Sequence, residues 1–425
     1  MDFIQMIKSK NAKFMVLIVF PIAISICFCI FCHREPISSD GKEYDIFAKN
    51  LLSFKGYTLD GVTPYALRPP LYSLFVALIY LFTKCNPIAV VIMQIILVAF
   101  VPYILYKTLL FAGFKEKESF LAALLVALYP FGYIYVQQLV TEPFTTFLFV
   151  IAAYCTIKIW LIKDLNFFEV LLLGMIITLP SLSKSQHISL ISALIISLAI
   201  KSFFEKELLK GAKKRIIPLI LGAVILLSPW ALRNYYHFRN PAVLGEGAFG
   251  ELLLKGFYET KDRWLLLTFW NEKSSGEMQS FKDWQIKMRE AEILSEEQKI
   301  PLGEAKAKIA LDEIRKEPLE AIRGYFVRLY SFWLMIPTEQ SLKMKVMTIF
   351  IDLFLLILAI IGFIVFYDVL LKKIFPVYLC LISENAILAI GHMEARYSIS
   401  VKIFVIMVVG LLLSKFIERI KNVRE

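Results

Sequence analysis

The sequence predicts an all-α polytopic integral membrane protein with about 10 transmembrane helices, and three observations predict this fold class. Hydrophobic residues make up 58% of the 425 residues, and the mean hydropathy of +0.66 is far above what a water-soluble domain can cover. Apolar runs of roughly 17–25 residues recur along the chain, which is the length that a helix needs to cross a bilayer. The runs lack the alternation of polar and apolar residues that membrane strands require.

The apolar runs, taken in order, define the predicted spans. They lie at about 14–32, 88–108, 119–138, 142–160, 167–183, 187–203, 215–232, 346–367, 374–391 and 398–415. Short clusters of Lys and Arg alternate with these runs and account for most of the net charge of +11. By the positive-inside rule the clusters lie in the cytoplasm, so both termini are predicted to be cytoplasmic. We therefore attribute the basic charge to membrane topology and expect no nucleic-acid partner.

Two further apolar stretches, residues 69–82 and 321–336, do not fit this charge pattern as full spans. The second mixes Arg323 and Arg328 with aromatic residues, which is typical of a helix that lies at the membrane interface. We predict interfacial or re-entrant helices for both. If both cross the membrane instead, the protein has 12 spans, and everything from residue 85 to residue 320 changes sides.

The polar residues divide the chain into three parts. Residues 1–234 form an N-terminal transmembrane module with a first outer loop at 33–68, and residues 341–425 form the C-terminal helices. Between them, residues 235–340 form a small, mainly helical extracytoplasmic region with an interfacial helix. A region of this size is marginally stable alone, so we expect it to pack on the membrane part.

The six cysteines lie in or beside apolar runs, and we expect no disulfide framework. Cys29, Cys32 and His33 match the C-x-x-C-H pattern of c-type haem attachment. Chance at the end of a cysteine-rich helix explains the match better. A haem or redox membrane protein stays open as one rival class.

Acids and bases from six separate segments fall on the outer face in this topology. Any one of them can be an interfacial anchor, but the convergence of so many needs another explanation. They are Asp40, Glu43, Tyr44 and Asp45; Arg68, just before Tyr72; Glu142; Lys184, Gln186 and His187; Arg233 and Asn234; and His392, Glu394, Arg396 and Tyr397.

A carboxylate surrounded by cations near the bilayer surface suits the transfer of a group from a phosphate-bearing lipid. The acid can act as general base on an acceptor hydroxyl, while Arg or Lys neutralises the departing phosphate. The sequence contains no P-loop and no G-x-G-x-x-G motif that would indicate a soluble nucleotide donor.

Five motifs in this order resemble the GT-C superfamily of polytopic glycosyltransferases. Within it, the resemblance is to the dolichyl-phosphate-mannose protein mannosyltransferases and the bacterial lipid A aminoarabinose transferases. The motifs are Asp40-x-x-x-Tyr44, Arg68-Pro69-Pro70-Leu71-Tyr72, Thr141-Glu142-Pro143, Pro229-Trp230-Ala231-Leu232-Arg233-Asn234 and Glu394-Ala395-Arg396-Tyr397.

The resemblance implies an inverting transfer of a monosaccharide from a polyprenyl-phosphate carrier, with Asp40 as general base. Glu43 is the alternative base, because the family often carries an adjacent acidic pair where this chain has Gly41. By the same resemblance the donor phosphate is bound by Arg68, Arg233, Arg396 and Lys184. Lys184 stands where many relatives have an Arg-Pro pair. Lysine keeps the positive charge at this position but lacks the bidentate hydrogen-bonding geometry of arginine.

The resemblance also implies further site residues and a cofactor. The further site residues are Tyr44, Tyr72, Glu142, Asn234, His392, Glu394 and Tyr397. Some members use a divalent metal, Mg²⁺ or Mn²⁺, beside the first-loop acid, and the sequence leaves metal binding open.

We therefore expect a glycosyltransferase of a bacterial or archaeal cell membrane with its active site on the outer face. The acceptor is a cell-surface glycan, a lipid or a protein. A transporter or flippase of a lipid-linked substrate is the main alternative. That class predicts internal repeats, which the sequence lacks. A phosphotransferase or glycan polymerase that acts on the same carriers is a second alternative.

Overall fold

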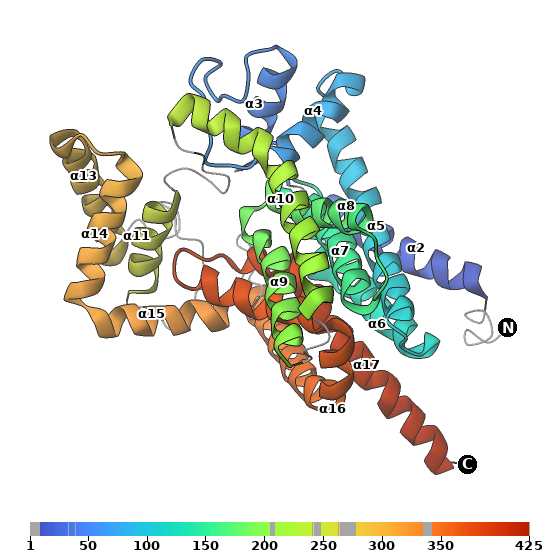
Figure 1. The fold of residues 1–425 in the computed structure, drawn as a ribbon. Coiled ribbons are helices and arrows are strands. Elements are labelled where there is room, and N and C mark those ends of the chain that lie inside the picture. The colour runs from blue at the N-terminus through green and yellow to red at the C-terminus, as the bar shows by residue number, and fades with distance from the viewer. Residues whose placement is uncertain are drawn as a thin grey trace.

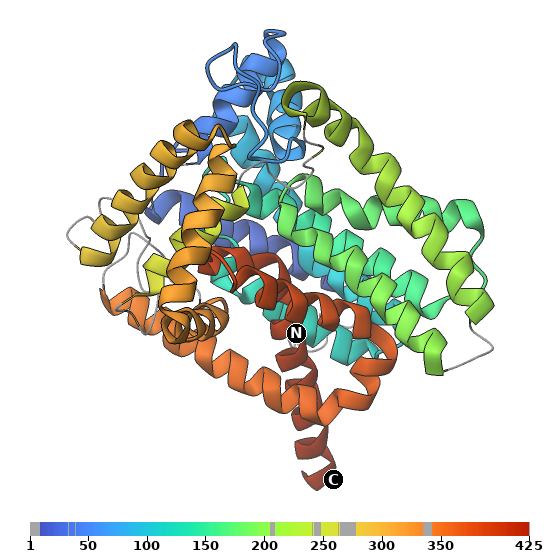
Figure 2. The same ribbon diagram turned by 60° about the vertical axis from the view of Figure 1, so that its left-hand side comes forward.

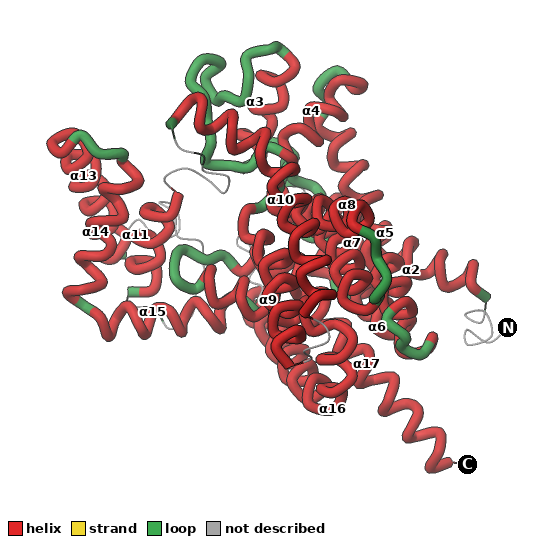
Figure 3. The backbone as a smooth tube through the Cα atoms, viewed as in Figure 1, coloured by secondary structure: helices red, strands yellow, loops and turns green. Residues whose placement is uncertain are grey.

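The computed structural model describes residues 9–32, 34–38, 40–204, 209–239, 241, 248–261, 263, 278–334 and 342–424. Within these ranges the regular elements are helices, and the extended pairing is limited to an isolated bridge between Thr58 and Pro64. Figure 3 shows the helices joined by loops. The all-α polytopic prediction is confirmed. His33 of the haem motif and Ser39 of the first outer loop lie outside the described residues.

Seven helices in the described ranges are long and apolar enough to cross a membrane. Six of them correspond to single predicted spans, and the seventh, α16 (Leu342–Leu388), contains two. The six are α2 (Lys10–Cys32), α5 (Pro87–Phe111), α7 (Thr141–Leu161), α9 (Ile188–Phe204), α10 (Leu209–Phe238) and α17 (Ile399–Arg424). α10 runs past Arg233 and Asn234, where the sequence predicted its end.

α16 is two helices that meet at a kink, in agreement with the two predicted spans. Ile374 at the junction has non-helical torsion angles, and Pro376 follows it. Proline has no N–H, so the carbonyl of Lys372, four residues earlier, loses its helical donor. The indole of Trp160 on α7 donates to that carbonyl instead, at 2.8 Å. The kink is thus satisfied by a neighbouring helix.

The prediction of one continuous span at 119–138 is wrong in its second half. α6 (Glu116–Leu128) ends before Pro130, which opens a short 3-10 turn, η1 (Pro130–Gly132). Proline has no N–H to donate and its ring clashes with the carbonyl four residues earlier, so it kinks or ends a helix, and here α6 ends before it. The irregular segment from 129 to 140 then leads to the start of α7. The run at 167–183 behaves similarly: α8 (Phe167–Thr178) continues as the 3-10 turn η2 (Leu179–Leu182).

Ion pairs tie together one end of the bundle. Lys13 of α2 pairs with Glu116 of α6 at 2.6 Å, and Lys115, beside α6, pairs with Glu418 of α17 at 3.0 Å. The ends of α2 and α17 that carry the chain termini therefore both contact the start of α6, and they lie on the right-hand side of Figure 1. The opposite ends of these helices carry the polar residues that the sequence placed outside.

Two short elements lie at that opposite end, α3 (Gly41–Leu52) and α4 (Leu71–Thr83). α4 has 13 residues and is about 20 Å long, short of the roughly 30 Å hydrocarbon core of a bilayer. One face of α4 buries Tyr72, Val76 and Tyr80, while Leu74, Leu78 and Leu81 are exposed. This pattern fits the predicted interfacial helix better than a full span.

Four helices form a separate group, here called the cap: α11 (Ala248–Thr260), α13 (Gln279–Gln298), α14 (Leu302–Lys316) and α15 (Pro318–Ser331). Figures 1 and 2 show the cap beside the bundle, with α15 leading back to it. Its small core contains Leu254, Phe257, Phe281 and Ala310.

α15 corresponds to the predicted interfacial segment 321–336, whose last residues, 335 and 336, lie outside the described residues. Its exposed face carries apolar side chains at helical spacing, as an interfacial helix requires. These side chains are Leu319, Ile322, Phe326 and Tyr330.

α17 and α7 are the most buried of the candidate spans. At Gly410 the backbone of α17 lies directly against the backbone of α6, without space for a side chain between them. A Cβ placed on Gly410 would lie 2.3 Å from Cα of Ala122. Only glycine permits this approach.

Replacing Gly410 by alanine should lower the apparent melting temperature of the detergent-purified protein. The new methyl group forces α6 and α17 apart, and overpacking of this kind costs about 1–3 kcal/mol. Gly132→Ala is the control, because its Cβ would meet only the Tyr129 ring at 3.8 Å. Equal thermal unfolding curves for the two variants would contradict the close packing of α6 and α17.

Candidate functional site

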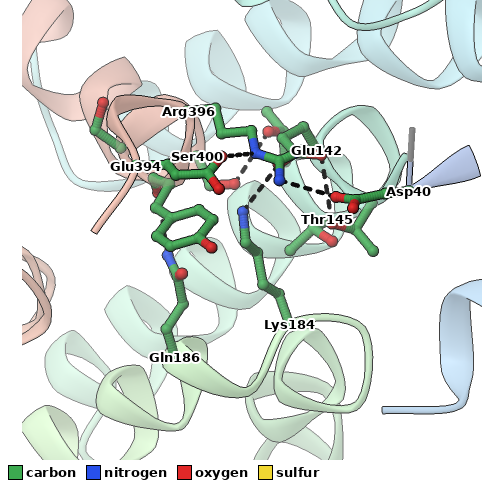
Figure 4. Close-up of polar contacts among 12 residues, drawn as sticks. Asp40, Glu142, Thr145, Lys184, Gln186, Glu394, Arg396 and Ser400 are labelled. Carbon is green, nitrogen blue, oxygen red and sulfur yellow. Dashed lines mark hydrogen bonds and ion pairs between the residues drawn. The ribbon is translucent and has the colours of Figure 1, made fainter. Parts of the chain in front are cut away.

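The Asp40 carboxylate joins two guanidinium groups that are far apart in the sequence. Asp40 precedes α3, and its side chain does not cap that helix. One carboxylate oxygen accepts from Arg68 at 3.1 Å, and the other accepts from Arg396 at 2.8 Å. Figure 4 shows Arg396 reaching Asp40. The structure therefore places the predicted base between two of the predicted phosphate ligands.

Arg68 is held by the first turn of α3. Glu43 lies one turn after Asp40 on the same face of α3, and its carboxylate accepts from the Arg68 Nε. The guanidinium also lies over the Tyr44 ring, 5.2 Å from its centre. Tyr72 packs edge-on against Tyr44 with ring centres 4.8 Å apart, but its hydroxyl donates to Gln94, away from Asp40.

Position 41 cannot carry the second acid of an adjacent pair. A Cβ on Gly41 would lie 2.8 Å from the carbonyl oxygen of Pro36 and 3.3 Å from that of Leu139. Sterics therefore disfavour an acidic pair at positions 40 and 41, and Glu43 supplies the next carboxylate along α3.

Arg396 gathers three carboxylates from three segments. Besides Asp40, its guanidinium pairs with Glu394 at 2.5 Å and with Glu142 at 3.6 Å. Arg396 stands in the 3-10 turn η5 (Ala395–Ser398) directly before α17, and Glu142 lies in the first turn of α7. These contacts put the end of α2 and the start of α7 on one face, which contradicts the 12-span alternative.

Lys184 completes the set of cations. Its ammonium pairs with Glu142 at 3.1 Å and lies 4.2 Å from the centre of the Tyr397 ring. Lys184 directly precedes the turn η3 (Ser185–His187), which leads into α9. The starts of α7, α9 and α17 therefore meet around Glu142 and Arg396, and Arg396 joins them to Asp40, as Figure 4 shows for the labelled side chains.

His392 lies between two carboxylates. Its Nε2 is 3.2 Å from Glu394, and its Nδ1 contacts Glu259 on the cap helix α11. Glu259 was not predicted, because nothing in the local sequence distinguishes it from other acids of the polar region.

Arg233 and Asn234 do not share the contacts of Asp40, and Arg233 binds the first outer loop instead. Arg233 donates to the carbonyl oxygens of Tyr65 and Tyr57, at 2.7 and 3.2 Å, and to the Asn234 side chain at 2.9 Å. Arg233 thus holds the first outer loop, and its assignment to the donor phosphate stays a prediction.

A second group of buried polar side chains, around Glu384 of α16, was also not predicted from the sequence. Glu384 pairs with His187 at 3.0 Å and accepts from Gln186, whose amide also donates to the Tyr397 carbonyl at 3.0 Å. Glu384 is an acidic residue inside the predicted span 374–391. An ionisable residue inside a span is rare and marks a functional or paired group, so this signal could have indicated the buried group from the sequence.

Burial and charge set the protonation states around Asp40. Burial raises the pKa of the Asp40 carboxyl, but the Arg396 and Arg68 guanidiniums outweigh burial and hold the pKa below its ordinary value. Likewise, burial raises the pKa of Glu394, while Arg396 and His392 bring it well below its usual range. Burial raises the pKa of Tyr44 to about 12. At neutral pH the two acids are therefore ionised and the Tyr44 hydroxyl keeps its proton.

The residues around Asp40 do not fit a divalent metal. In the described part of the chain, no three His, Cys, Asp or Glu side chains are grouped so as to hold a metal ion. Glu142 and Glu394 are joined to Asp40 through the Arg396 guanidinium, which occupies the place between the carboxylates. No step proposed below depends on a metal.

Fold and site together define a polytopic membrane protein with an acid–guanidinium centre where several helix ends meet. A family model described as dolichyl-phosphate-mannose-protein mannosyltransferase matches residues 67–232. This match covers less than half of the chain and agrees there with the resemblance to the GT-C superfamily. The matched segment includes Arg68, Glu142 and Lys184 but neither Asp40 nor Arg396.

Among solved structures, the chain is similar to the crystal structure of ArnT from Cupriavidus metallidurans bound to undecaprenyl phosphate. The two share 11% sequence identity with a TM-score of 0.43, over 95% of this chain and 78% of that chain. No curated protein matches the chain.

The Asp40 ion pairs should make stability depend on pH in the acidic range. The folded-state pKa of Asp40 lies below its unfolded value of about 3.9, so its contribution is complete above pH 3.9 and is lost as the pH falls through the folded-state pKa. Apparent melting temperatures between pH 3 and pH 7 should therefore fall less steeply at the acidic end in Asp40→Asn than in the wild type. Parallel curves would contradict the pairing of Asp40 with Arg68 and Arg396.

Proposed function

We propose that this protein transfers a monosaccharide from a polyprenyl-phosphate carrier to an acceptor on the outer face of the membrane, with inversion at the anomeric carbon. Asp40 is the general base, and the acceptor is a cell-surface glycan, a lipid or a protein. The observation that carries the proposal is that Asp40 pairs with two cations from two other segments, Arg68 and Arg396. Lys184 joins the same cluster through Glu142, which also pairs with Arg396.

The proposed reaction balances as one displacement. The acceptor hydroxyl oxygen bonds to the anomeric carbon as the bond from that carbon to the phosphate oxygen breaks. The electron pair leaves with the polyprenyl phosphate, and the hydroxyl proton passes to Asp40. Attack from the side opposite the phosphate inverts the configuration.

The guanidinium groups of Arg68 and Arg396 serve both the base and the leaving group. A guanidinium has five N–H donors, so each can hold a phosphate oxygen while it still contacts Asp40. A bound phosphate draws part of their positive charge away from Asp40, and the carboxylate becomes more basic as a result. Donor binding thereby prepares the base, and Lys184 adds charge beside Glu142.

The arrangement of charges supports an outer-face active site. Lys13 and Lys115, at the opposite end of the bundle from Asp40, belong to the basic clusters that the positive-inside rule assigns to the cytoplasm.

A flippase of a lipid-linked substrate is the second candidate, and one observation favours it. Asp352 of α16 pairs with Lys402 of α17 at 2.8 Å and accepts from the Tyr129 hydroxyl at 2.7 Å. Both charged side chains are buried, and ionisable groups inside a membrane often mark a transport path.

Asp40→Asn should abolish transfer, because an amide cannot take the hydroxyl proton. We expect a loss of about 10²–10⁴-fold in kcat. Purified protein is incubated with polyprenyl-phosphate sugars and a panel of acceptors, and mass spectrometry follows loss of the sugar and release of polyprenyl phosphate.

Two controls accompany this measurement. Asp164→Asn, an exposed acid beyond α7, should behave as the wild type, and Glu43→Gln separates the two candidate bases. Full activity in Asp40→Asn with loss in Glu43→Gln would reassign the base. No turnover in any protein, together with movement of the lipid across proteoliposome membranes, would favour the flippase.

Arg396→Ala should weaken donor use strongly, by about 10²–10³-fold in kcat/KM, because it removes a donor to the leaving phosphate. Arg233→Ala should also weaken it, and less, because Arg233 is bonded to the carbonyls of Tyr57 and Tyr65. Steady-state kinetics at varied donor concentration measure both. If neither variant changes kcat/KM, the phosphate-site assignment is wrong.

A further inference from the structure

The segment that carries Glu394 and Arg396 is attached to the cap helix α11. The backbone N–H of His392 donates to the Leu252 carbonyl at 2.7 Å, and the N–H of Met393 donates to the Glu259 carboxylate at 3.3 Å. Gly256 and Gly391 touch: a Cβ on Gly256 would lie 2.4 Å from the carbonyl carbon of Gly391. The end of α16 is therefore seated directly on α11.

A buried arginine reinforces this junction. Arg328 of α15 is 3% exposed and donates to the carbonyl oxygen of Ala389 at 2.7 Å. It also donates to the Gly256 carbonyl and to the Thr260 hydroxyl on α11. The same guanidinium thus binds the residue just after α16 and the last turns of α11, and the two helix ends are held in one position.

Polar contacts continue from this junction to the reaction centre. Glu259 contacts His392, which contacts Glu394, which pairs with Arg396, which pairs with Asp40. The exposed fraction of the side chains rises along this path, from 2% at Glu259 and 5% at His392 to 23% at Asp40. The well-buried end lies in the cap, and the accessible end is the proposed base.

We propose that Glu259 and His392 are positioning residues that fix the Arg396 guanidinium against the Asp40 carboxylate. Neither touches Asp40, and both act through Glu394. The inference rests on the proposed function and extends it: the cap is part of the catalytic machinery, because a side chain of α11 orients a residue of the transmembrane site.

The proton on His392 decides whether both carboxylates are held. An imidazolium donates to Glu259 and Glu394 together, whereas neutral imidazole has one N–H and can donate to only one of them. Burial lowers the pKa of His392, but the Glu259 and Glu394 carboxylates outweigh burial and Lys255 of α11, so the pKa is raised. The Tyr397 ring stands edge-on to the imidazole at 6.5 Å.

The positioned state is complete while His392 is protonated, and it is lost as the pH rises through the raised pKa of His392, above 6.5. kcat of the wild type should therefore fall on the alkaline side.

The test compares pH–rate profiles of the full-length wild type, Glu259→Gln and His392→Gln, with a polyprenyl-phosphate sugar as donor. Both variants should lose about 10–100-fold in kcat, as expected when a reacting group is misplaced by about 1 Å. In His392→Gln the alkaline fall should disappear. Glu251→Gln is the matched control on α11, since Glu251 pairs with Lys306 inside the cap.

Hydrogen exchange supplies a readout that does not depend on turnover. Amides at 389–398 should exchange faster in Glu259→Gln and His392→Gln than in the wild type or Glu251→Gln. If His392→Gln does not fold, Glu259→Asp, which keeps the charge and shortens the side chain, tests the same contact.

The outcomes separate this inference from the proposed function. If Asp40→Asn is inactive while His392→Gln keeps the wild-type profile and exchange rates, the positioning role is overturned and the proposed function stands. If the wild type transfers no sugar, the proposed function fails. Exchange at 389–398 then decides alone whether Glu259 and His392 hold the segment.

Discussion

The Arg396 guanidinium is the contact on which the polar centre depends. It pairs with Asp40, Glu142 and Glu394, which come from three segments. A largely buried carboxylate is costly unless a cation and hydrogen bonds compensate it. The largely buried acids are stable only while the first outer loop, the start of α7 and the segment before α17 meet at this arginine. One cation therefore orders the ends of several helices.

The membrane explains why these groups lie at helix ends. A spanning helix satisfies its own backbone, and side-chain charge is tolerated best where the chain leaves the hydrocarbon core. Asp40 and Lys184 stand in short non-helical stretches between helices, and Arg396 stands in the short 3-10 turn η5. Such stretches let side chains from distant parts of the chain face one another, and the rigid helices behind them hold the positions. The cap adds a second support through α11, on the side of Glu394.

The sequence was most informative where one principle acted alone. Apolar length and charge bias predicted ten spans, and eight of them coincide with long apolar helices, since α16 contains two. At the other two, α6 and α8 are shorter than predicted. The prediction was wrong where a local breaker competed with apolar length: Pro130 ends α6 inside an apolar run, whereas Pro376 bends α16, whose carbonyl at Lys372 finds a donor in Trp160. Hydropathy cannot distinguish these outcomes, because proline changes the backbone hydrogen bonds and not the apolar length of the run.

For the candidate site, too, part could be predicted from the sequence and part depended on the tertiary structure. Residue type and topology alone brought Asp40, Arg68, Glu142, Lys184, Glu394 and Arg396 to one face, because a helix of spanning length fixes the side on which each end emerges. Only the tertiary structure decided which cation meets which acid. In that structure Arg233 donates to the carbonyls of Tyr57 and Tyr65, and Glu259 contacts His392. Pairing depends on distances between segments far apart in the sequence, and no local pattern encodes those distances.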